Sequence, residues 1–246
     1  MEKQPFLRME GIHKFYGSVH ALKGVDFEVG FNKVVGLVGE NGAGKSTLIG
    51  IISGSIPKSS GRIFVKGKEV EIPSVKAARD LGIETVYQDQ AVIDIISVSK
   101  NVFLGRELLK PGLIKLMDME RMRGEAEGVT SLLGLHIASP DQEVRFCSGG
   151  DRQGVAIARA MYFKAELVIL DEPTAALSIS AAQKVLEFVR QLKDSGVSCI
   201  LISHNLYHVY PVADRIIVLS RGQKVADMRK EETSIEELEQ IMTLGK

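Results

Sequence analysis

The stretch "VVGLVGENGAGKSTLIG", residues 34–50, determines how the rest of this 246-residue sequence is interpreted. The apolar run 34–38 predicts a buried strand, the glycine-rich segment 39–47 follows it, and apolar residues at helical spacing come next. A strand, a glycine-rich loop ending in Lys-Ser and a helix, in this order, are typical of a phosphate-binding loop. The alternative, a glycine-rich turn without function, would leave the Lys-Ser pair and its flanking elements unexplained.

Each part of this loop has an expected role toward ATP and Mg²⁺. The glycines allow backbone N–H groups to turn toward phosphate oxygens, and the helix N-terminus adds a partial positive charge. Lys45 is expected to reach the β- and γ-phosphates, and the Ser46 hydroxyl to bind Mg²⁺. The predicted nucleotide-binding residues of the loop are Gly39, Glu40, Asn41, Gly42, Ala43, Gly44, Lys45, Ser46 and Thr47.

Three further apolar runs predict additional strands of the same sheet. They are "ETVY" (84–87), "LVIL" (167–170) and "VSCILIS" (197–203). Because helical patterns separate them, we expect a mostly parallel core sheet, as in P-loop NTPases. The segments "FEVGF" and "GRIFVKGKEVEI" alternate around glycine turns and predict a flanking antiparallel β part.

Polar side chains follow each of these strands, where ligands of open α/β sheets bind. Asp171 is expected to hold the Mg²⁺ shell, and Glu172 to orient and deprotonate the attacking water. Gln88 can bond metal or water, and His204 can reach the γ-phosphate and position the water. Taken singly, these residues would be read as solvated strand ends or satisfied core residues. Their shared position predicts one catalytic site.

The region between the second and third strands predicts a helical insert. Met119, Met122, Ala126, Val129, Leu132 and Leu133 repeat at helical spacing behind Asp118, a candidate N-cap. We therefore divide one ATPase domain into a nucleotide-binding core (1–88 and 161–225), a helical subdomain (89–160) and a C-terminal tail helix (226–246), which begins at a capping box from Ser234 to Glu237.

Two other stretches are candidates for nucleotide contacts. "CSGGDRQGVAIARA", residues 147–160, predicts a tight turn that opens into a helix, the usual form of an anion site. Tyr16 lies ahead of the phosphate loop and could stack on adenine. Core packing of Tyr16 is an equal alternative from spacing alone, and the same holds for the choice of Tyr16 over Phe15.

Composition limits the partners. Lys+Arg and Asp+Glu balance at 31 each, so no global positive field favours nucleic acid. No apolar run is long enough to span a bilayer and no secretory signal opens the chain, so we expect a cytoplasmic protein. Of the two cysteines, Cys199 lies in an apolar run and Cys147 opens the second turn, a pattern that suggests neither disulfides nor a metal site.

Taken in order, these motifs resemble the nucleotide-binding subunit of an ATP-binding-cassette transporter over essentially the whole chain. The resemblance implies a head-to-tail homodimer, in which Ser148, Gly149 and Gly150 of one copy cover ATP on the phosphate loop of the other. It also implies a transmembrane permease partner docked near 89–106, a position on the inner face of the cell membrane, and indirectly a solute-binding protein.

Finer similarity, in "YQDQAVID", "NVFLGRE" and "DEPTAALS", is to the monosaccharide-importer branch for ribose, galactose, xylose or fructose. Three residues depart from the family pattern. Cys147 replaces a leucine, Asp151 a glutamine or glutamate, and Ser178 an aspartate. The sequence does not determine whether these changes reduce turnover or the communication between the two sites of the dimer.

Alternative functions are an importer ATPase for another small solute, a cassette ATPase acting on DNA or ribosomes, and a regulator that binds nucleotide without hydrolysis. The second would favour a basic patch, a second cassette or a long coiled-coil insert, none of which the sequence contains. Glu172 and His204 argue against the third.

Overall fold

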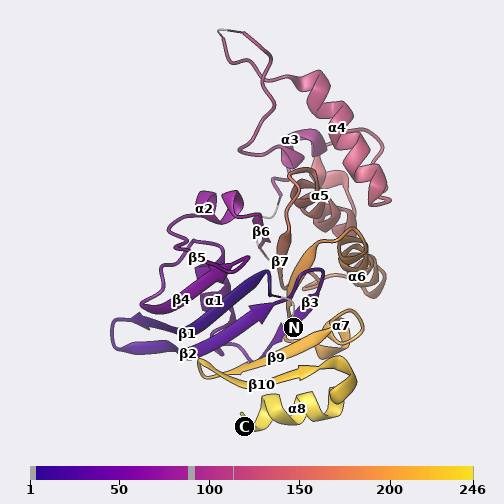
Figure 1. The fold of residues 1–246 in the computed structure, drawn as a ribbon. Helices are drawn as coiled ribbons and strands as arrows, with labels where there is room; N and C mark the ends of the chain where they lie inside the picture. The colour runs from indigo at the N-terminus through magenta and orange to yellow at the C-terminus, as the bar shows by residue number, and fades with distance from the viewer. Residues whose placement is uncertain (1–3, 88–91, 113, 246) are drawn as a thin grey trace.

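The computed structural model describes residues 4–87, 92–112 and 114–245, and its centre is a six-stranded sheet (Figure 1). The strand order is β10-β9-β3-β8-β7-β6, and all neighbours are parallel except the β9–β10 hairpin. The strands are β3 (Val34–Val38), β6 (Ile83–Val86), β7 (Leu167–Asp171), β8 (Ser198–Ile202), β9 (Arg215–Ser220) and β10 (Gln223–Arg229). The four predicted core strands and their parallel arrangement are confirmed.

Both faces of this sheet are buried. Alternate residues of a strand point to opposite faces. In β7, Val168 and Leu170 belong to one apolar cluster, whereas Leu167 and Ile169 belong to a second cluster. Burial on both faces explains why the core strands are continuous apolar runs.

An antiparallel sheet of order β2-β1-β4-β5 packs beside the core (Figure 1). Its strands are β1 (Leu7–Tyr16), β2 (Val19–Val29), β4 (Ser60–Val65) and β5 (Lys68–Glu69). The predicted β part is thus present, and "GRIFVKGKEVEI" contains the β4–β5 hairpin. Only the first three residues of "FEVGF" belong to a strand, because the long strand β2 ends at Val29. Its partner β1 was not predicted, because β1 carries charged residues among its apolar ones. Helices α1 (Lys45–Ile52) and α2 (Val75–Asp80) complete this part of the chain.

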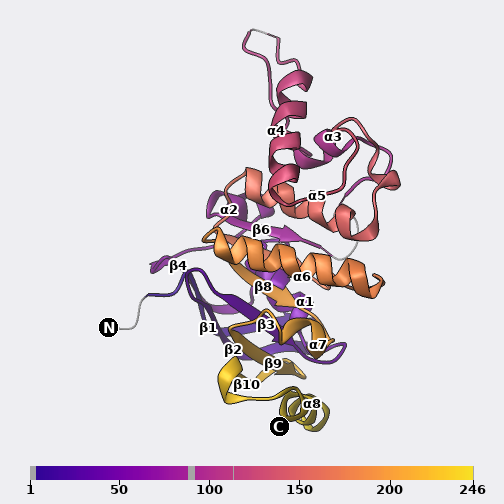
Figure 2. The same ribbon diagram turned by 90° about the vertical axis from the view of Figure 1, so that its right-hand side faces the viewer.

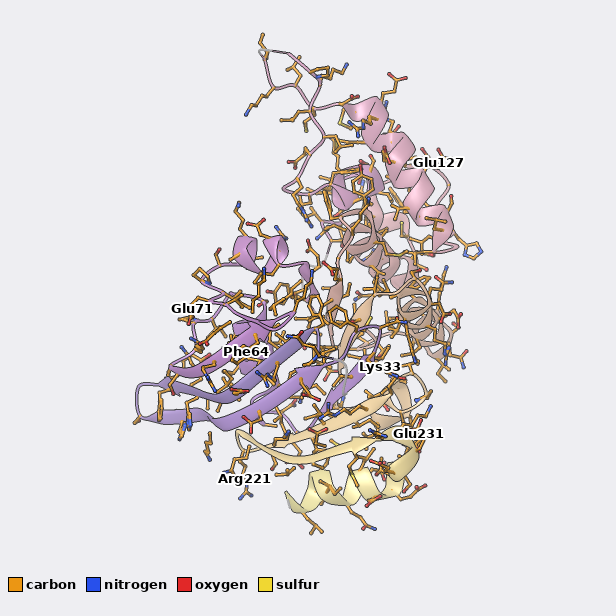
Figure 3. The ribbon with its side chains drawn as sticks, viewed as in Figure 1. Lys33, Phe64, Glu71, Glu127, Arg221 and Glu231 are labelled. Carbon is orange, nitrogen blue, oxygen red and sulfur yellow. The ribbon has the colours of Figure 1, made fainter. Side chains whose placement is uncertain are left out.

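The predicted helical insert forms the upper part of the molecule in both views (Figures 1 and 2). It contains α3 (Val98–Val102), α4 (Met119–Leu132), a 3-10 turn (Val144–Phe146) and α5 (Gly149–Tyr162). Asp118 caps α4 as expected, because its carboxylate accepts the Arg121 N–H. Met122 and Ala126 are buried, but Leu132 is exposed: it lies on the outward side of the helix end, whereas Leu133 packs inward. Glu127 lies on the outer face of α4 (Figure 3).

A buried carboxylate joins this insert to the core sheet. Glu84 on β6 is 6% exposed and pairs with Arg106 and with Arg79, whose Nε lies 3.4 Å away. The Arg106 guanidinium also stacks 3.6 Å from the ring centroid of Phe163, at the end of α5. Because a buried carboxylate needs such partners, the apolar run "ETVY" contains one charged residue that anchors the insert.

The helices of the C-terminal part pack on the core sheet, α6 beside β8 and α8 beside β9. It contains α6 (Ile179–Asp194), α7 (Leu206–Val209), a 3-10 turn (Lys230–Glu232) and α8 (Ile235–Leu244). Ser234 caps α8 by accepting the Glu237 N–H, which is one half of the predicted capping box, and the Glu237 carboxylate accepts from Thr233 Oγ1. The expected division at 225/226 falls inside β10, so the core sheet continues to Arg229. Among the described residues, no helix combines the length and the apolar character needed to cross a membrane.

Candidate nucleotide-binding site

A cavity of about 610 Å³ opens at the carboxyl ends of β3, β7 and β8. The whole predicted phosphate loop except Gly39 lines it, together with the three predicted side chains that follow β7 and β8. The lining residues are Val19, His20, Ala21, Glu40, Asn41, Gly42, Ala43, Gly44, Lys45, Ser46, Thr47, Asp171, Glu172, Ala175, His204 and Arg221. Gln88 lies outside the described residues.

The phosphate loop is held tightly against the β9–β10 turn and the β2 strand. Gly39 has φ +149°, and a Cβ there would lie 2.2 Å from the Leu219 carbonyl oxygen. Gly44 has φ +108°, and a Cβ there would lie 2.9 Å from Leu22 Cδ2. Both positions therefore require glycine. Gly44 is also the N-cap of α1 and offers no side-chain cap, which leaves the helix N-terminus open toward the cavity.

Lys45 lies in this loop with its ammonium group turned onto the loop itself. Its Nζ donates to the carbonyl oxygens of Gly39 at 2.6 Å and Glu40 at 3.0 Å. Burial lowers the pKa of Lys45, and the charges of Glu172 and Asp171 oppose that shift. The ammonium is thus positioned between carbonyls and two carboxylates, where phosphate oxygens would find a buried cation.

Asp171 and Glu172 occupy different environments although they are adjacent. Burial and the neighbouring Glu172 carboxylate raise the pKa of Asp171, while Lys45 counteracts part of the shift. Asp171 ends β7, whereas Glu172 adopts a left-handed backbone with φ +46°. This conformation costs a residue other than glycine about 1 kcal/mol or more. It rotates Glu172 away from the strand direction and into the cavity wall.

The Glu172 carboxylate is held by three hydrogen bonds from the end of β8. Ser203 Oγ donates to Oε2 at 3.0 Å, and the His204 backbone N–H donates to Oε1 at 3.0 Å. His204 Nδ1 lies 2.8 Å from the same Oε1. The Glu172 side chain is 12% exposed, and that of His204 is 63% exposed. The carboxylate is therefore fixed in direction while its imidazole partner faces the open cavity.

Ser203 and Arg221 are among the residues of this site that the sequence did not predict. Ser203 orients Glu172. The sequence feature that could have revealed it is its position as the last residue of the apolar run "VSCILIS", next to His204. Arg221, labelled in Figure 3, lines the cavity from the β9–β10 turn. In the sequence, Arg221 appears only as part of an Arg-Gly pair after an apolar run. Its place at the phosphate loop depends on the pairing of β9 with β3, which brings the β9–β10 turn there.

Tyr16 is exposed at the end of β1, so the core-packing alternative is wrong. Lys14 Nζ lies 4.9 Å from the Tyr16 ring centroid. Phe15 is also exposed, and its ring stacks on His20 at a centroid distance of 4.0 Å. His20 itself lines the cavity. Stacking of Tyr16 on adenine stays a prediction.

The second turn has a different character. Ser148 is the N-cap of α5, and its Oγ accepts the Asp151 N–H at 3.2 Å and donates to Asp151 Oδ2 at 2.5 Å. Asp151 is buried and also accepts from Lys184 Nζ at 2.6 Å and from the His136 N–H at 3.2 Å. Gly149 packs so closely on Leu177 that a Cβ would lie 2.8 Å from Leu177 Cδ2.

The residues that depart from the family pattern have local structural roles. Burial and the Asp151 charge raise the pKa of the Cys147 thiol, which makes it less reactive. Ser178 caps α6 by accepting the Ala181 N–H. Asp151 ties α5 to Lys184 on α6. Among the residues that the structure describes, the cavity lining includes none of Ser148, Gly149 and Gly150.

These features define the chain as a phosphate-loop ATP-binding domain with an inserted helical part. The sequence profile described as "ABC transporter" matches residues 22–175, more than half of the chain. The chain belongs to this family and is an ATP-binding cassette ATPase.

Individual relatives agree along nearly the whole chain. The xylose/arabinose import ATP-binding protein of Sulfolobus acidocaldarius is 44% identical over 243 residues, which are 98% of this chain and 96% of that protein. The fructose import ATP-binding protein of Rhizobium meliloti is 39% identical over 251 residues, 100% of this chain and 96% of that one. Among solved structures, the ADP conformation of an ATP-binding cassette from an ABC transporter is similar with a TM-score of 0.83 and 26% identity, covering 98% of this chain and 96% of that one. The predicted fold class is confirmed.

Proposed function

We propose that this chain hydrolyses ATP to drive monosaccharide import through a separate transmembrane permease. The observation that carries the proposal is the Glu172 carboxylate, which Ser203 and His204 hold in the same cavity as Lys45. Whole-length similarity to pentose and fructose import proteins supports the choice of sugar as substrate class.

In the proposed reaction the phosphates lie on the open N-terminus of α1, with Lys45 against the β- and γ-phosphates. A water on the far side of the γ-phosphate donates a hydrogen bond to Glu172, which takes its proton as the water attacks. His204 Nδ1 donates to the Glu172 carboxylate. For Nε2 to donate a hydrogen bond to a phosphate oxygen at the same time, both ring nitrogens must carry a proton. The products are ADP and inorganic phosphate, and the proton remains on the carboxylate until release.

The residues present fit a Mg²⁺ ion. Asp171 supplies a carboxylate and Ser46 a hydroxyl to the same cavity, and hard oxygen ligands of this kind suit Mg²⁺. The described residues contain no cluster of three or more His, Cys, Asp or Glu side chains that could hold a metal. Phosphate oxygens and water would therefore complete the shell, and Gln88 is proposed as a further ligand. When bound, the ion would neutralise charge on the phosphates.

We further propose that two copies pair head to tail, with Ser148, Gly149 and Gly150 of one copy on the ATP of the other. The absence of these three residues from the described lining of the chain's own cavity supports assembly between chains. A second copy would supply the donors that face the γ-phosphate from outside.

The remaining assignments follow from this arrangement. We place the permease contact at the segment 89–106, of which residues 92–106 are described, and the chain on the inner face of the membrane. A solute-binding protein is an indirect partner. The core, helical insert and tail helix act as parts of one domain, since one apolar cluster joins Val38 and Val86 of the sheet to Phe103 and Met122 of the insert.

Replacing Glu172 tests the hydrolytic part of the proposal. Glu172→Gln keeps one oxygen that accepts from His204 and gains an NH₂ group that can donate to the Ser203 hydroxyl, but it cannot take the proton of water. We expect a fall in turnover of about 10²-fold or more, with nucleotide affinity unchanged. Phosphate release and fluorescence titration measure the two quantities. Near-normal turnover would remove Glu172 from the base role.

Reconstitution with the co-purified permease tests the substrate class. Sugar uptake into ATP-loaded liposomes, with pentoses, hexoses and amino acids compared, should occur with a monosaccharide and fail with Glu172→Gln. Uptake of another solute class with full ATPase activity would preserve the ATPase proposal and overturn sugar import.

A further inference from the structure

The loop that connects α3 to α4 projects beyond the rest of the helical insert in both views (Figures 1 and 2). Its base is fixed. Asp118 N–H donates to the Leu108 carbonyl at 2.7 Å, and Lys110 N–H donates to the Leu116 carbonyl at 2.8 Å. Leu109 and Met117 form an antiparallel bridge. Leu108 packs against the core, so a defined hairpin base carries the exposed tip.

From Leu109 to Met117, the exposed side chains that the structure describes in this loop are apolar or basic. We call them the finger, and they are Leu109, Lys110, Ile114, Lys115, Leu116 and Met117. Ile114 is 74% exposed and Leu116 is 60% exposed. Four large apolar side chains within nine residues are thus offered to the surroundings, and such a cluster marks an interaction surface.

The charge of the finger indicates its partner. No acidic residue occurs in the sequence between Glu107 and Asp118, whereas Lys110 and Lys115 lie among the apolar residues. Lysines that alternate with apolar residues can bury the apolar groups at a lipid surface while their ammonium groups remain at the headgroups. A protein groove would have to desolvate both ammonium groups unless it supplied carboxylates.

We propose that the finger binds a membrane surface that carries anionic lipid headgroups. The apolar side chains enter the interface, and the two lysines pair with phosphate groups of the lipids. This contact goes beyond the proposed ATPase and import function and does not depend on turnover. It would hold the helical insert at the bilayer next to the permease.

A tryptophan reporter tests the proposal, because the chain has no tryptophan of its own. Leu116→Trp places a single reporter on the finger. Leu132→Trp is the matched control, since Leu132 is 74% exposed at the opposite end of α4. Each full-length variant is titrated with vesicles of phosphatidylcholine alone and with vesicles in which about a third of the lipid is phosphatidylglycerol. Circular dichroism shows that both variants are folded, whether or not they hydrolyse ATP.

We expect a blue shift of fluorescence for Leu116→Trp with the anionic vesicles, a much weaker one with neutral vesicles, and none for Leu132→Trp. Adding Lys110→Gln and Lys115→Gln should lower the affinity for anionic vesicles by about tenfold or more. No shift for Leu116→Trp, or equal shifts for the two reporters, overturns the proposal. Equal fluorescence shifts with neutral and anionic vesicles also overturn it, because they would show that anionic headgroups do not contribute to binding.

A shift that requires purified permease in detergent and does not occur with vesicles also overturns it, because the finger would then be a protein contact. Loss of ATP hydrolysis in the unmodified chain would contradict the proposed function but leave the vesicle results interpretable.

Discussion

The phosphate loop and the Ser148 turn both present backbone N–H groups at the start of a helix, but they differ in what already satisfies those groups. Helix α1 has no side-chain cap and no acidic residue in its first turn. Helix α5 is capped by Ser148 and has Asp151 in its first turn. An anion therefore meets open donors at α1 and an internal carboxylate at α5.

The two elements are therefore not interchangeable as phosphate sites. The Ser148 hydroxyl donates to Asp151, so it must exchange that bond to donate to a phosphate. Lys184 and the His136 N–H would keep Asp151 satisfied during the exchange. We therefore expect the phosphate loop to bind nucleotide alone, and the Ser148 turn to contact a phosphate that another element already holds.

The largest effect is expected when the phosphate loop is disabled on one chain and the Ser148 turn on another. In a Glu172→Gln background, one tagged chain carries Lys45→Ala and another carries Ser148→Arg. Each homodimer has lesions in both sites, but the mixed pair has one intact site if the elements meet between chains. ATP-dependent pairing of the two tags should therefore far exceed pairing within either variant.

Both variants must be shown to be folded by circular dichroism. If mixing them gave no gain in pairing, the phosphate loop and the Ser148 turn would not meet across a dimer, and the comparison would lose its functional meaning.

The next largest effect should come from removing the cation beside Asp151. Lys184→Met leaves a carboxylate that is only 6% exposed without its ionic partner. We expect the free energy of unfolding to fall by about 2–3 kcal/mol, less than for a fully buried pair because Lys184 is partly exposed. Urea denaturation measures the change.

Lys193→Met is the matched control on the same helix. Lys193 Nζ lies 2.8 Å from Asp214 Oδ1, but Asp214 is 22% exposed and also accepts the Val34 N–H. A loss of about 1 kcal/mol or less is expected there. Equal losses in the two variants would show that the Asp151 pair is an ordinary surface contact, and Asp151→Asn should restore part of the stability of Lys184→Met.

A smaller effect is expected at the part of the site proposed to hold the adenine base. Tyr16→Ala should weaken binding of ATP and GTP alike by about tenfold, because stacking uses the face of any purine. Phe15→Ala should leave the fold stable, since Phe15 is exposed. Fluorescent-nucleotide titration measures the affinity. Unchanged affinity in a stable Tyr16→Ala variant would exclude the stacking role.

The smallest effect concerns acid pH. Burial alone would raise the pKa of Asp151, but hydrogen bonds from Lys184, Ser148 and the His136 N–H outweigh it, so the pKa is lowered. Just below the unfolded value of about 3.9, the unfolded chain then binds more protons than the folded one, and stability falls as the pH falls. Urea midpoints at successive pH values should fall less steeply for Asp151→Asn than for the unmodified chain. Parallel curves would contradict the stabilised carboxylate.

Much of the fold could be predicted because its core strands are short, apolar and followed by polar residues. Periodicity and capping located α4 and the phosphate loop. Strand β1 escaped prediction because only one of its faces is buried and a bulge interrupts its pairing with β2. Strand order was also out of reach, since β6 follows β3 in sequence but lies at the far edge of the sheet.

Local patterns define the class of chemistry, because glycines at positive φ, a lysine within the loop and carboxylates after a buried strand all have local causes. The partners of these groups depend on how distant parts of the chain pack together. Ser203 orients Glu172, Arg221 reaches the cavity from the β9–β10 turn, and Lys184 holds Asp151 from another helix. Such contacts join residues far apart in the chain, so they depend on strand order and helix packing, which no local pattern encodes.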